Sequence, residues 1–150
     1  MLSDMPCTFS HDHVGITVTP QDLDATIAWY SRNLGFTVDA RFESHGTTFV
    51  YLAVGDVKIE LLAGASQRNG VPSDNVLTSM DPSRLHHFCI AVADLDAAVA
   101  RLLKLDVPLI GGPMEIPEIG QRIVFITDNV GTIIEVTEPR TWPARRNGRA

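Results

Sequence analysis

The sequence predicts an α+β fold in which two paired βαβββ modules form a cupped mixed sheet. One indication is that His13 and Glu60 are separated by the same interval, to within one residue, as His87 and Glu135. Such a repeat of chemically matched residues indicates an internal duplication. Two further segments recur at corresponding places: Asp22-Leu-Asp-Ala25 as Asp94-Leu-Asp-Ala97, and Phe49-Val-Tyr-Leu52 as Ile123-Val-Phe-Ile126.

The first half is predicted to fold as a strand, a helix and three strands. Residues 13–18 alternate apolar with polar or small side chains, which indicates a half-buried strand. Asp22 is a typical N-cap and Gly35 a typical residue beyond a helix C-terminus, so a helix is expected between them. Its apolar stripe consists of Leu23, Ile27, Tyr30 and Leu34. Turn residues then separate expected strands at 36–42, 48–54 and 57–62.

The second half repeats this order. Residues 87–92 are the expected strand, and Asp94 is the expected N-cap of a helix. The apolar stripe of that helix consists of Leu95, Val99 and Leu102. Strands are expected near Ile110 and at 122–127 and 132–137.

All 150 residues are expected to form one domain. Module one covers about residues 11–64, the linker about 65–84, module two about 85–139, and a polar, solvated tail 140–150. The linker is rich in Ser, Asn, Gly, Pro and Asp, with a short helical turn expected at Val76-Leu77.

Composition excludes several classes of function. The net charge of −6 and the absence of a basic stripe outside the tail argue against a nucleic-acid partner. The N-terminus lacks a basic segment followed by an apolar core, and no apolar run approaches the roughly 20 residues of a membrane span. A cytoplasmic protein is therefore expected. Two cysteines do not indicate a disulfide framework.

The duplicated quartet predicts a metal site. His13 and His87 open their strands, whereas Glu60 and Glu135 lie inside apolar strands. A carboxylate inside a closed sheet costs several kcal/mol unless it is paired or bound to metal. If the halves face each other across a pseudo-twofold axis, two imidazoles and two carboxylates can share one divalent cation. Zn, Ni, Co, Mn and Fe all suit such ligands.

Other histidines and arginines carry less weight in the sequence. His11 is expected to be solvated, His45 to lie in a turn, and His86 to point to the face opposite His87. Arg41 and Arg122 are the candidate anionic handles, although exposed arginines are usually solvated. The substrate is expected beside Thr17, Cys89 and Tyr51 or Phe125.

The sequence resembles the vicinal oxygen chelate superfamily from about His11 to Pro139. The resemblance implies a glyoxalase-like cup around one divalent ion, ligated by His13, Glu60, His87 and Glu135. It also implies a homodimer, with the ligands supplied by one chain or swapped between two. The motifs that carry it are Asp12-His-Val-Gly-Ile16, Trp29-Tyr30, Leu34-Gly35-Phe36, Lys58-Ile-Glu-Leu-Leu62, Leu85-His-His-Phe88 and Gly131-Thr-Ile-Ile-Glu135.

Among the members, methylmalonyl-CoA epimerase is locally the most similar, through Ser44-His-Gly46, Val57-Lys-Ile-Glu-Leu-Leu62 and His86-His-Phe-Cys-Ile90. The resemblance implies a metal-dependent isomerase or lyase that abstracts a proton α to a carbonyl or thioester. Glu60 or Glu135 would ligate the metal and shuttle the proton, and Glu43 is an outside candidate for the base.

Three alternatives stay open. Glyoxalase I shares the quartet, but Thr17 stands where its glutathione-binding arginine is expected, and the region of Ala63-Gly64 replaces its asparagine. An Fe(II) extradiol dioxygenase would use His13, His87 and Glu135, leaving Glu60 to block an open position. A non-enzymatic resistance protein that binds small molecules has no need of the quartet.

Overall fold

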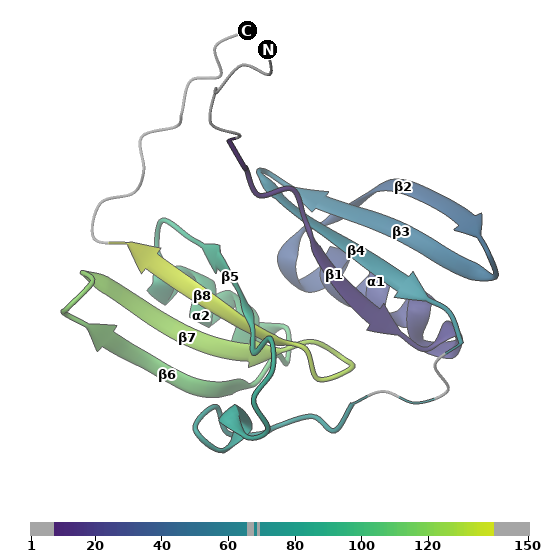
Figure 1. The fold of residues 1–150 in the computed structure, drawn as a ribbon. Coiled ribbons are helices and arrows are strands. Elements are labelled where there is room, and N and C mark those ends of the chain that lie inside the picture. Colours follow the sequence, from purple (N-terminus) through teal and green to yellow (C-terminus); the bar gives the residue numbers. More distant parts are fainter. Residues whose placement is uncertain (1–7, 66–67, 69, 140–150) are drawn as a thin grey trace, which may run out of the picture.

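The computed structural model describes residues 8–65, 68 and 70–139 as two βαβββ halves (Figure 1). The predicted polar tail lies outside these residues. The first half contains β1 (Val14–Val18), α1 (Leu23–Leu34), β2 (Thr37–Ser44), β3 (Thr47–Val54) and β4 (Val57–Ala63). The second contains β5 (Phe88–Ala91), α2 (Leu95–Lys104), β6 (Leu109–Ile116), β7 (Gln121–Thr127) and β8 (Ile133–Pro139). Short 3₁₀ helices cover Pro20–Asp22 and Thr78–Met80.

The predicted α+β class and the duplicated βαβββ order are confirmed, with one difference in the sheet. The strands form two four-stranded mixed sheets, ordered β1-β4-β3-β2 and β5-β8-β7-β6. In each sheet the first and last strands of the half pair in parallel, and the other neighbours are antiparallel. Strands β1 and β5 lie on the facing edges of the two sheets and run in opposite directions (Figure 1).

The helix ends follow the expected capping chemistry, with one added turn. Gly35 has a φ of 77° and its N–H closes the last turn of α1 on Ser31 and Tyr30. The Asp94 side chain accepts the N–H of Ala97 at 2.9 Å and caps α2. Asp22 is at the N-cap position of α1 but makes no side-chain cap bond, since a 3₁₀ turn capped by Thr19 precedes the helix.

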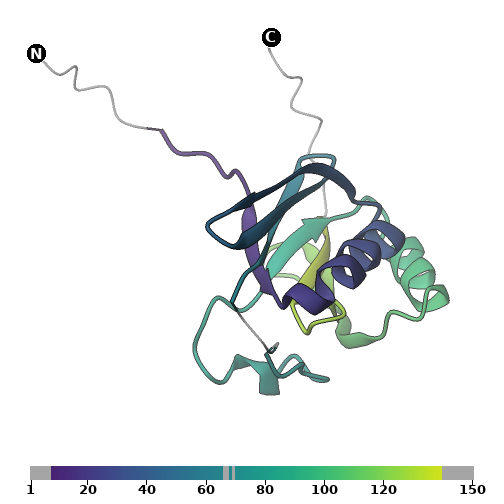
Figure 2. The same cartoon turned by 90° about the vertical axis from the view of Figure 1, so that its right-hand side faces the viewer.

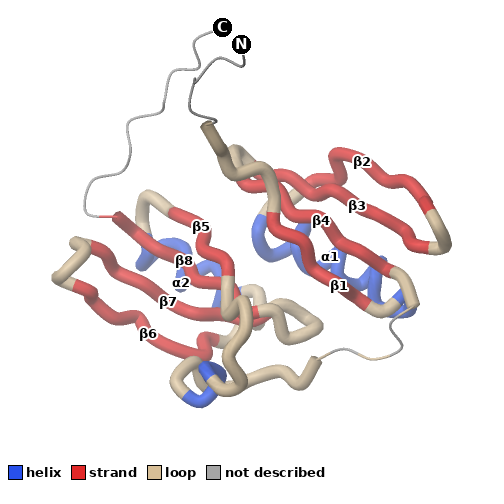
Figure 3. The backbone as a smooth tube through the Cα atoms, viewed as in Figure 1, coloured by secondary structure: helices blue, strands red, loops and turns tan. Residues whose placement is uncertain are grey.

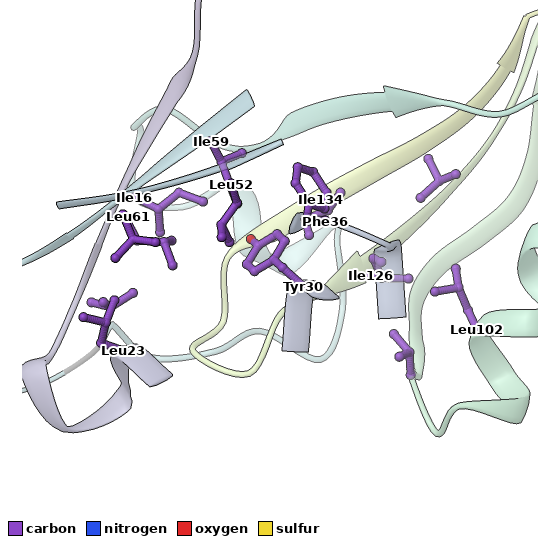
Figure 4. Close-up of a cluster of buried hydrophobic side chains, with 14 of the residues drawn as sticks. Ile16, Leu23, Tyr30, Phe36, Leu52, Ile59, Leu61, Leu102, Ile126 and Ile134 are labelled. Carbon is purple, nitrogen blue, oxygen red and sulfur yellow. The ribbon is translucent and has the colours of Figure 1, made fainter. Parts of the chain in front are cut away.

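Both helices lie on the same side of the sheets, as Figure 2 and Figure 3 show. One hydrophobic core under the helices continues from the first half into the second. Figure 4 shows Tyr30 of α1 among side chains of both halves, with Leu52 and Ile126 on either side. No helix among the described residues has the length and apolar character needed to cross a membrane.

A buried hydrogen bond joins the halves. The Tyr30 hydroxyl donates to Asp128 Oδ2 at 2.8 Å, and Asp128 Oδ1 accepts the backbone N–H groups of Val130 and Thr132. Burial and the Asp128 carboxylate raise the pKa of Tyr30 well above its usual value, so its phenol stays protonated and donates.

Tyr30→Phe should therefore destabilise the fold by about 1–3 kcal/mol, because Asp128 keeps its burial and loses a partner. Urea unfolding followed by circular dichroism measures the change in free energy. Tyr51→Phe is the matched control, since it removes a hydroxyl from a carboxylate outside the core and should have a smaller effect. Equal stability of Tyr30→Phe and wild type would show that this bond does not contribute.

Candidate metal centre

The first candidate pair is formed by His13, which precedes β1, and Glu60, in the middle of β4. The distance between His13 Nε2 and Glu60 Oε2 is 3.1 Å. The Glu60 side chain is 13% exposed, and its other oxygen accepts a 2.9 Å hydrogen bond from the Tyr51 hydroxyl. Each carboxylate oxygen of Glu60 is thus held by a polar partner.

The second half contains the corresponding pair with a different supporting residue. His87 Nε2 lies 3.0 Å from Glu135 Oε2, and the Glu135 side chain is 15% exposed. Phe125 occupies the position equivalent to Tyr51 and has no hydroxyl to offer. Cys89 lies opposite Glu135 in the β5–β8 register, and its Sγ donates to Glu135 Oε1 at 3.5 Å. The duplication therefore conserves the pair while changing the donor to the second oxygen.

Both glutamates face away from the helices, as strand alternation predicts. Ile59 and Leu61, which flank Glu60, are fully buried in the core, and Ile134 is equally buried beside Glu135. Since neighbouring side chains of a strand point to opposite faces, the two carboxylates lie on the open faces of the sheets.

A carboxylate precedes His13, the first candidate ligand. Asp12 Oδ2 lies 2.7 Å from His13 Nδ1. This hydrogen bond is the main cause of a raised pKa for His13 and of a lowered pKa for Asp12. The hydrogen bond to Glu60 raises the pKa of Tyr51, so its hydroxyl stays protonated as a donor. The first half-site is therefore a connected network of acidic and basic groups.

The expected orientation of His86 is wrong. Its Nδ1 lies 2.8 Å from the Nδ1 of His87, and the two rings meet edge to face. The alternation rule fails here because both residues precede β5 and do not follow the pleat of a strand. Burial, followed by the charges of His87 and Arg84, lowers the pKa of His86.

The two pairs do not meet within the part of the chain that the structure describes. Among those residues, no three or more His, Cys, Asp or Glu side chains are placed to hold one metal ion. By donor type each half does fit a divalent cation, with one imidazole nitrogen and one carboxylate oxygen 3.0–3.1 Å apart. The predicted quartet is thus divided into two half-sites of two ligands each.

Glu43, the outside candidate for a base, lies on the opposite face of the first sheet. Its neighbour Phe42 stacks on Phe49 and Tyr51, on the same face as Glu60. Glu43 instead accepts a hydrogen bond from Thr48 at 3.4 Å. One residue along β2 reverses the face, so Glu43 does not share the open face with Glu60.

Both candidate anionic handles are engaged on the helix side of the sheets. Arg41 pairs with Asp24 of α1 at 3.4 Å, and Arg122 with Asp96 of α2 at 2.8 Å. The bond to Arg122 lowers the pKa of Asp96. Neither arginine is available to an anion on the open faces in this arrangement.

A pocket beside His87 was not anticipated from the sequence. Its volume is about 420 Å³, and the linker supplies most of its apolar wall, with Phe125 on the sheet side. Arg84, three residues before His87, also lines it. Its position three residues before His87 is the sequence feature that could have identified Arg84 as a site residue. The lining residues are Val76, Leu77, Met80, Pro82, Ser83, Arg84, His86, His87 and Phe125.

Cys89 should alkylate slowly although it is exposed. Partial desolvation and the Glu135 carboxylate raise the pKa of its thiol to about 12. In a Cys7→Ser background, iodoacetamide should modify Cys89 at pH 8 about 10²–10³-fold more slowly than a free cysteine, because the thiolate is the nucleophile. Mass spectrometry over time measures this rate. Glu135→Gln should accelerate it, whereas a rate equal to that of the unfolded chain would contradict the raised pKa.

Comparison with known proteins places this geometry in a wider context. Residues 12–125 match the family model described as the glyoxalase/bleomycin resistance protein/dioxygenase superfamily. The crystal structure of a glyoxalase family protein from Enterococcus faecalis superposes with a TM-score of 0.69 at 21% identity. That match covers 86% of this chain and 97% of the other.

Two curated relatives are epimerases by name. The ethylmalonyl-CoA/methylmalonyl-CoA epimerase of Cereibacter sphaeroides is 31% identical over 132 residues, covering 85% of this chain and 96% of the relative. The mitochondrial methylmalonyl-CoA epimerase of Homo sapiens is 28% identical over 131 residues, covering 85% of this chain and 72% of the relative.

Proposed function

This chain belongs to the glyoxalase/bleomycin resistance protein/dioxygenase superfamily, and from that premise we propose that it is a metal-dependent epimerase of acyl-CoA thioesters. The observation that carries the proposal is the pair of duplicated half-sites, each with a largely buried glutamate beside a histidine on an open sheet face. The similarity to two epimerases over most of the chain supports it. Cytoplasmic location and the absence of nucleic-acid and membrane partners stay predictions from the sequence.

Glu60 and Glu135 are the acid and base of this proposal. One carboxylate takes the proton from the carbon α to the thioester carbonyl, and the C–H electron pair moves into an enolate. The other glutamate, protonated, then returns a proton to the opposite face of that carbon. Two carboxylates on equivalent positions of duplicated sheets suit this exchange of faces.

His13, Glu60, His87 and Glu135 would hold the divalent ion. When bound, the ion supplies Lewis-acid stabilisation of the negative charge that develops on the thioester oxygen. Because the half-sites do not form one cluster in the described residues, we infer that they combine between two copies of the chain. The first half of one copy then supplies two ligands and the second half of the other copy supplies two. A homodimer follows from this arrangement.

The substrate class follows from the relatives and from the pocket beside His87. Both epimerase names specify a CoA thioester whose acyl group carries one free carboxylate. The apolar wall of the pocket suits a short alkyl branch, and Arg84 at the same pocket supplies a cation for the carboxylate. Arg84 is therefore proposed as the anionic handle in place of Arg41 and Arg122.

The test is proton exchange in D₂O under nitrogen. The protein is loaded in turn with Co, Ni, Zn, Mn and Fe and incubated with methylmalonyl-CoA or ethylmalonyl-CoA, and deuterium at the α carbon is followed by mass spectrometry. Metal-dependent deuteration with inversion is expected. Turnover of a hemithioacetal would favour the glyoxalase I alternative, and iron-dependent oxygen uptake with catechols the dioxygenase. No turnover and no bound metal would leave a binding protein as the better interpretation.

A further inference from the structure

A chain of hydrogen bonds leads from the linker to the ligand His87. Ser79 is 1% exposed, and its hydroxyl lies 2.5 Å from the Val76 carbonyl oxygen and 2.7 Å from His86 Nε2. His86 Nδ1 lies 2.8 Å from His87 Nδ1, and His87 Nε2 faces Glu135 Oε2. Each link is short enough for a hydrogen bond, so the direction of each one constrains the next.

The proton positions follow from the first link. A carbonyl oxygen only accepts, so the single proton of Ser79 goes to Val76, and Ser79 accepts from His86 Nε2–H. In a neutral His86 the other nitrogen, Nδ1, is then an acceptor. His87 must donate to it from Nδ1–H, so Nε2 is the ring nitrogen that faces Glu135, and in a neutral His87 it carries the lone pair. A ring nitrogen and a carboxylate oxygen 3.0 Å apart can share a proton or can ligate one cation together.

In the first half, a carboxylate fixes the orientation of the histidine directly. Asp12 occupies the position equivalent to His86, and its carboxylate accepts from His13 Nδ1–H at 2.7 Å. His13 Nε2 is consequently the ring nitrogen that faces Glu60, at 3.1 Å from Oε2. The duplication thus retains an acceptor immediately before each ligand histidine. In the second half that acceptor is an imidazole, which needs Ser79 to fix its own orientation.

The 3₁₀ turn that carries Ser79 is anchored to the second sheet. The Val76 N–H donates to the Ile110 carbonyl of β6 at 3.0 Å. A Cβ at Gly111 would lie 2.5 Å from Val76 Cγ1, so the absence of a side chain there allows this close approach. The linker is therefore bound to β6 through Val76, and Ser79 contacts His86, which precedes β5.

We propose that Ser79 and His86 are positioning residues that hold His87 in its Nδ1–H tautomer, with Nε2 presented as the metal-binding lone pair. This inference rests on the proposed metal-dependent function for its purpose, but the hydrogen bonds that carry it join protein groups alone. It also makes the linker part of the candidate site. Hydrogen-bond partners of this kind orient ligand imidazoles and raise metal affinity.

The first experiment records the tautomers directly. Metal-free protein with ¹⁵N-labelled histidine is studied by long-range ¹H–¹⁵N correlation at one fixed alkaline pH, where free imidazoles are neutral. In the wild type, His87 should show a protonated Nδ1 and an unprotonated Nε2. Ser79→Ala should convert the His87 signals to a mixture of tautomers. Thr78→Ala is the matched control, because its hydroxyl donates to the Asn75 carbonyl in the same turn, and it should preserve the wild-type pattern.

A rescue variant separates positioning from general damage to the turn. His86→Asp places in the second half the acceptor that Asp12 provides in the first. In the Ser79→Ala background, His86→Asp should restore the Nδ1–H tautomer of His87, since a carboxylate accepts whatever happens at residue 79. Co²⁺ titration in parallel should show affinity lowered about 10–100-fold by Ser79→Ala and regained in the double variant.

The possible failures are distinguishable. An unchanged tautomer and unchanged Co²⁺ affinity in Ser79→Ala would overturn the positioning roles and leave the metal-dependent function standing. The predicted tautomer changes without Co²⁺ binding by any variant would instead overturn the metal-dependent function. An Nε2–H tautomer of His87 in the wild type would contradict the hydrogen-bond directions from which the proposal starts.

Discussion

Replacing Glu135 by glutamine is expected to lower the rate of epimerisation of methylmalonyl-CoA by about 10²–10⁴-fold, the usual contribution of one general acid or base. Glutamine keeps the length and an oxygen for the contact with Cys89, but its amide cannot carry the proton. Glu60→Gln should cause a loss of similar size. The rate is followed by circular dichroism of a single epimer, with the metal content of each variant measured in parallel.

The two variants should differ in what they still do. With one carboxylate removed, the remaining one can take a proton from its own face and return deuterium to it without inversion. Glu135→Gln should therefore exchange the α-proton of one epimer, and Glu60→Gln that of the other. Loss of exchange for both epimers in either variant would indicate a single base and contradict the division of roles.

A control of the same chemical type is available in the turn between β6 and β7. Glu118 is exposed there and makes no hydrogen bond or ion pair among the described residues, so Glu118→Gln should leave the rate within about twofold of wild type. Glu43→Gln tests the base that the sequence suggested. If Glu43→Gln abolished inversion while Glu135→Gln did not, Glu43 would be the base although it lies on the opposite face of the sheet from Glu60.

The duplication made most of the fold predictable. The spacing of His13, Glu60, His87 and Glu135 and the two Asp-Leu-Asp-Ala segments located both modules without any knowledge of tertiary structure. Strand alternation then placed Glu60 and Glu135 on the open faces, because Ile59 and Ile134 had to be buried. Within a module, local pattern and register determine geometry to the level of a side chain.

The predictions failed where local pattern stops. His86 lies before β5, outside the pleat, so its contact with His87 depends on the path of the linker. Ser79 gave no signal, since a serine in a polar linker is most often solvated, yet it is buried by the packing of Val76 against β6. The relation between the half-sites depends on packing between modules or copies, which no repeat within one chain specifies.

Mixing two inactive variants should restore activity if the half-sites combine between copies. A His13→Ala chain lacks a ligand in its first half, and a His87→Ala chain lacks one in its second. In a mixed dimer, one site combines the two mutated halves and lacks both histidines. The other site combines the first half of the His87→Ala chain with the second half of the His13→Ala chain, and it is intact. Co-refolding equal amounts should recover about a quarter of the wild-type metal occupancy and epimerisation rate, because half of the dimers carry one intact site of two.

The same experiment distinguishes a site shared between two chains from a site built within one chain. If each chain assembled its own quartet, every site in every dimer would lack one histidine, and mixing would restore nothing. Two controls are needed. Each variant refolded alone should stay inactive. A His13→Ala, His87→Ala chain mixed with wild type should not exceed the activity of the wild-type chains present. Sedimentation of wild type as a monomer at the assay concentration, with full metal occupancy, would refute the shared site. The two His–Glu pairs would then have to close on one ion within a single chain, through a change in how the two sheets pack along β1 and β5.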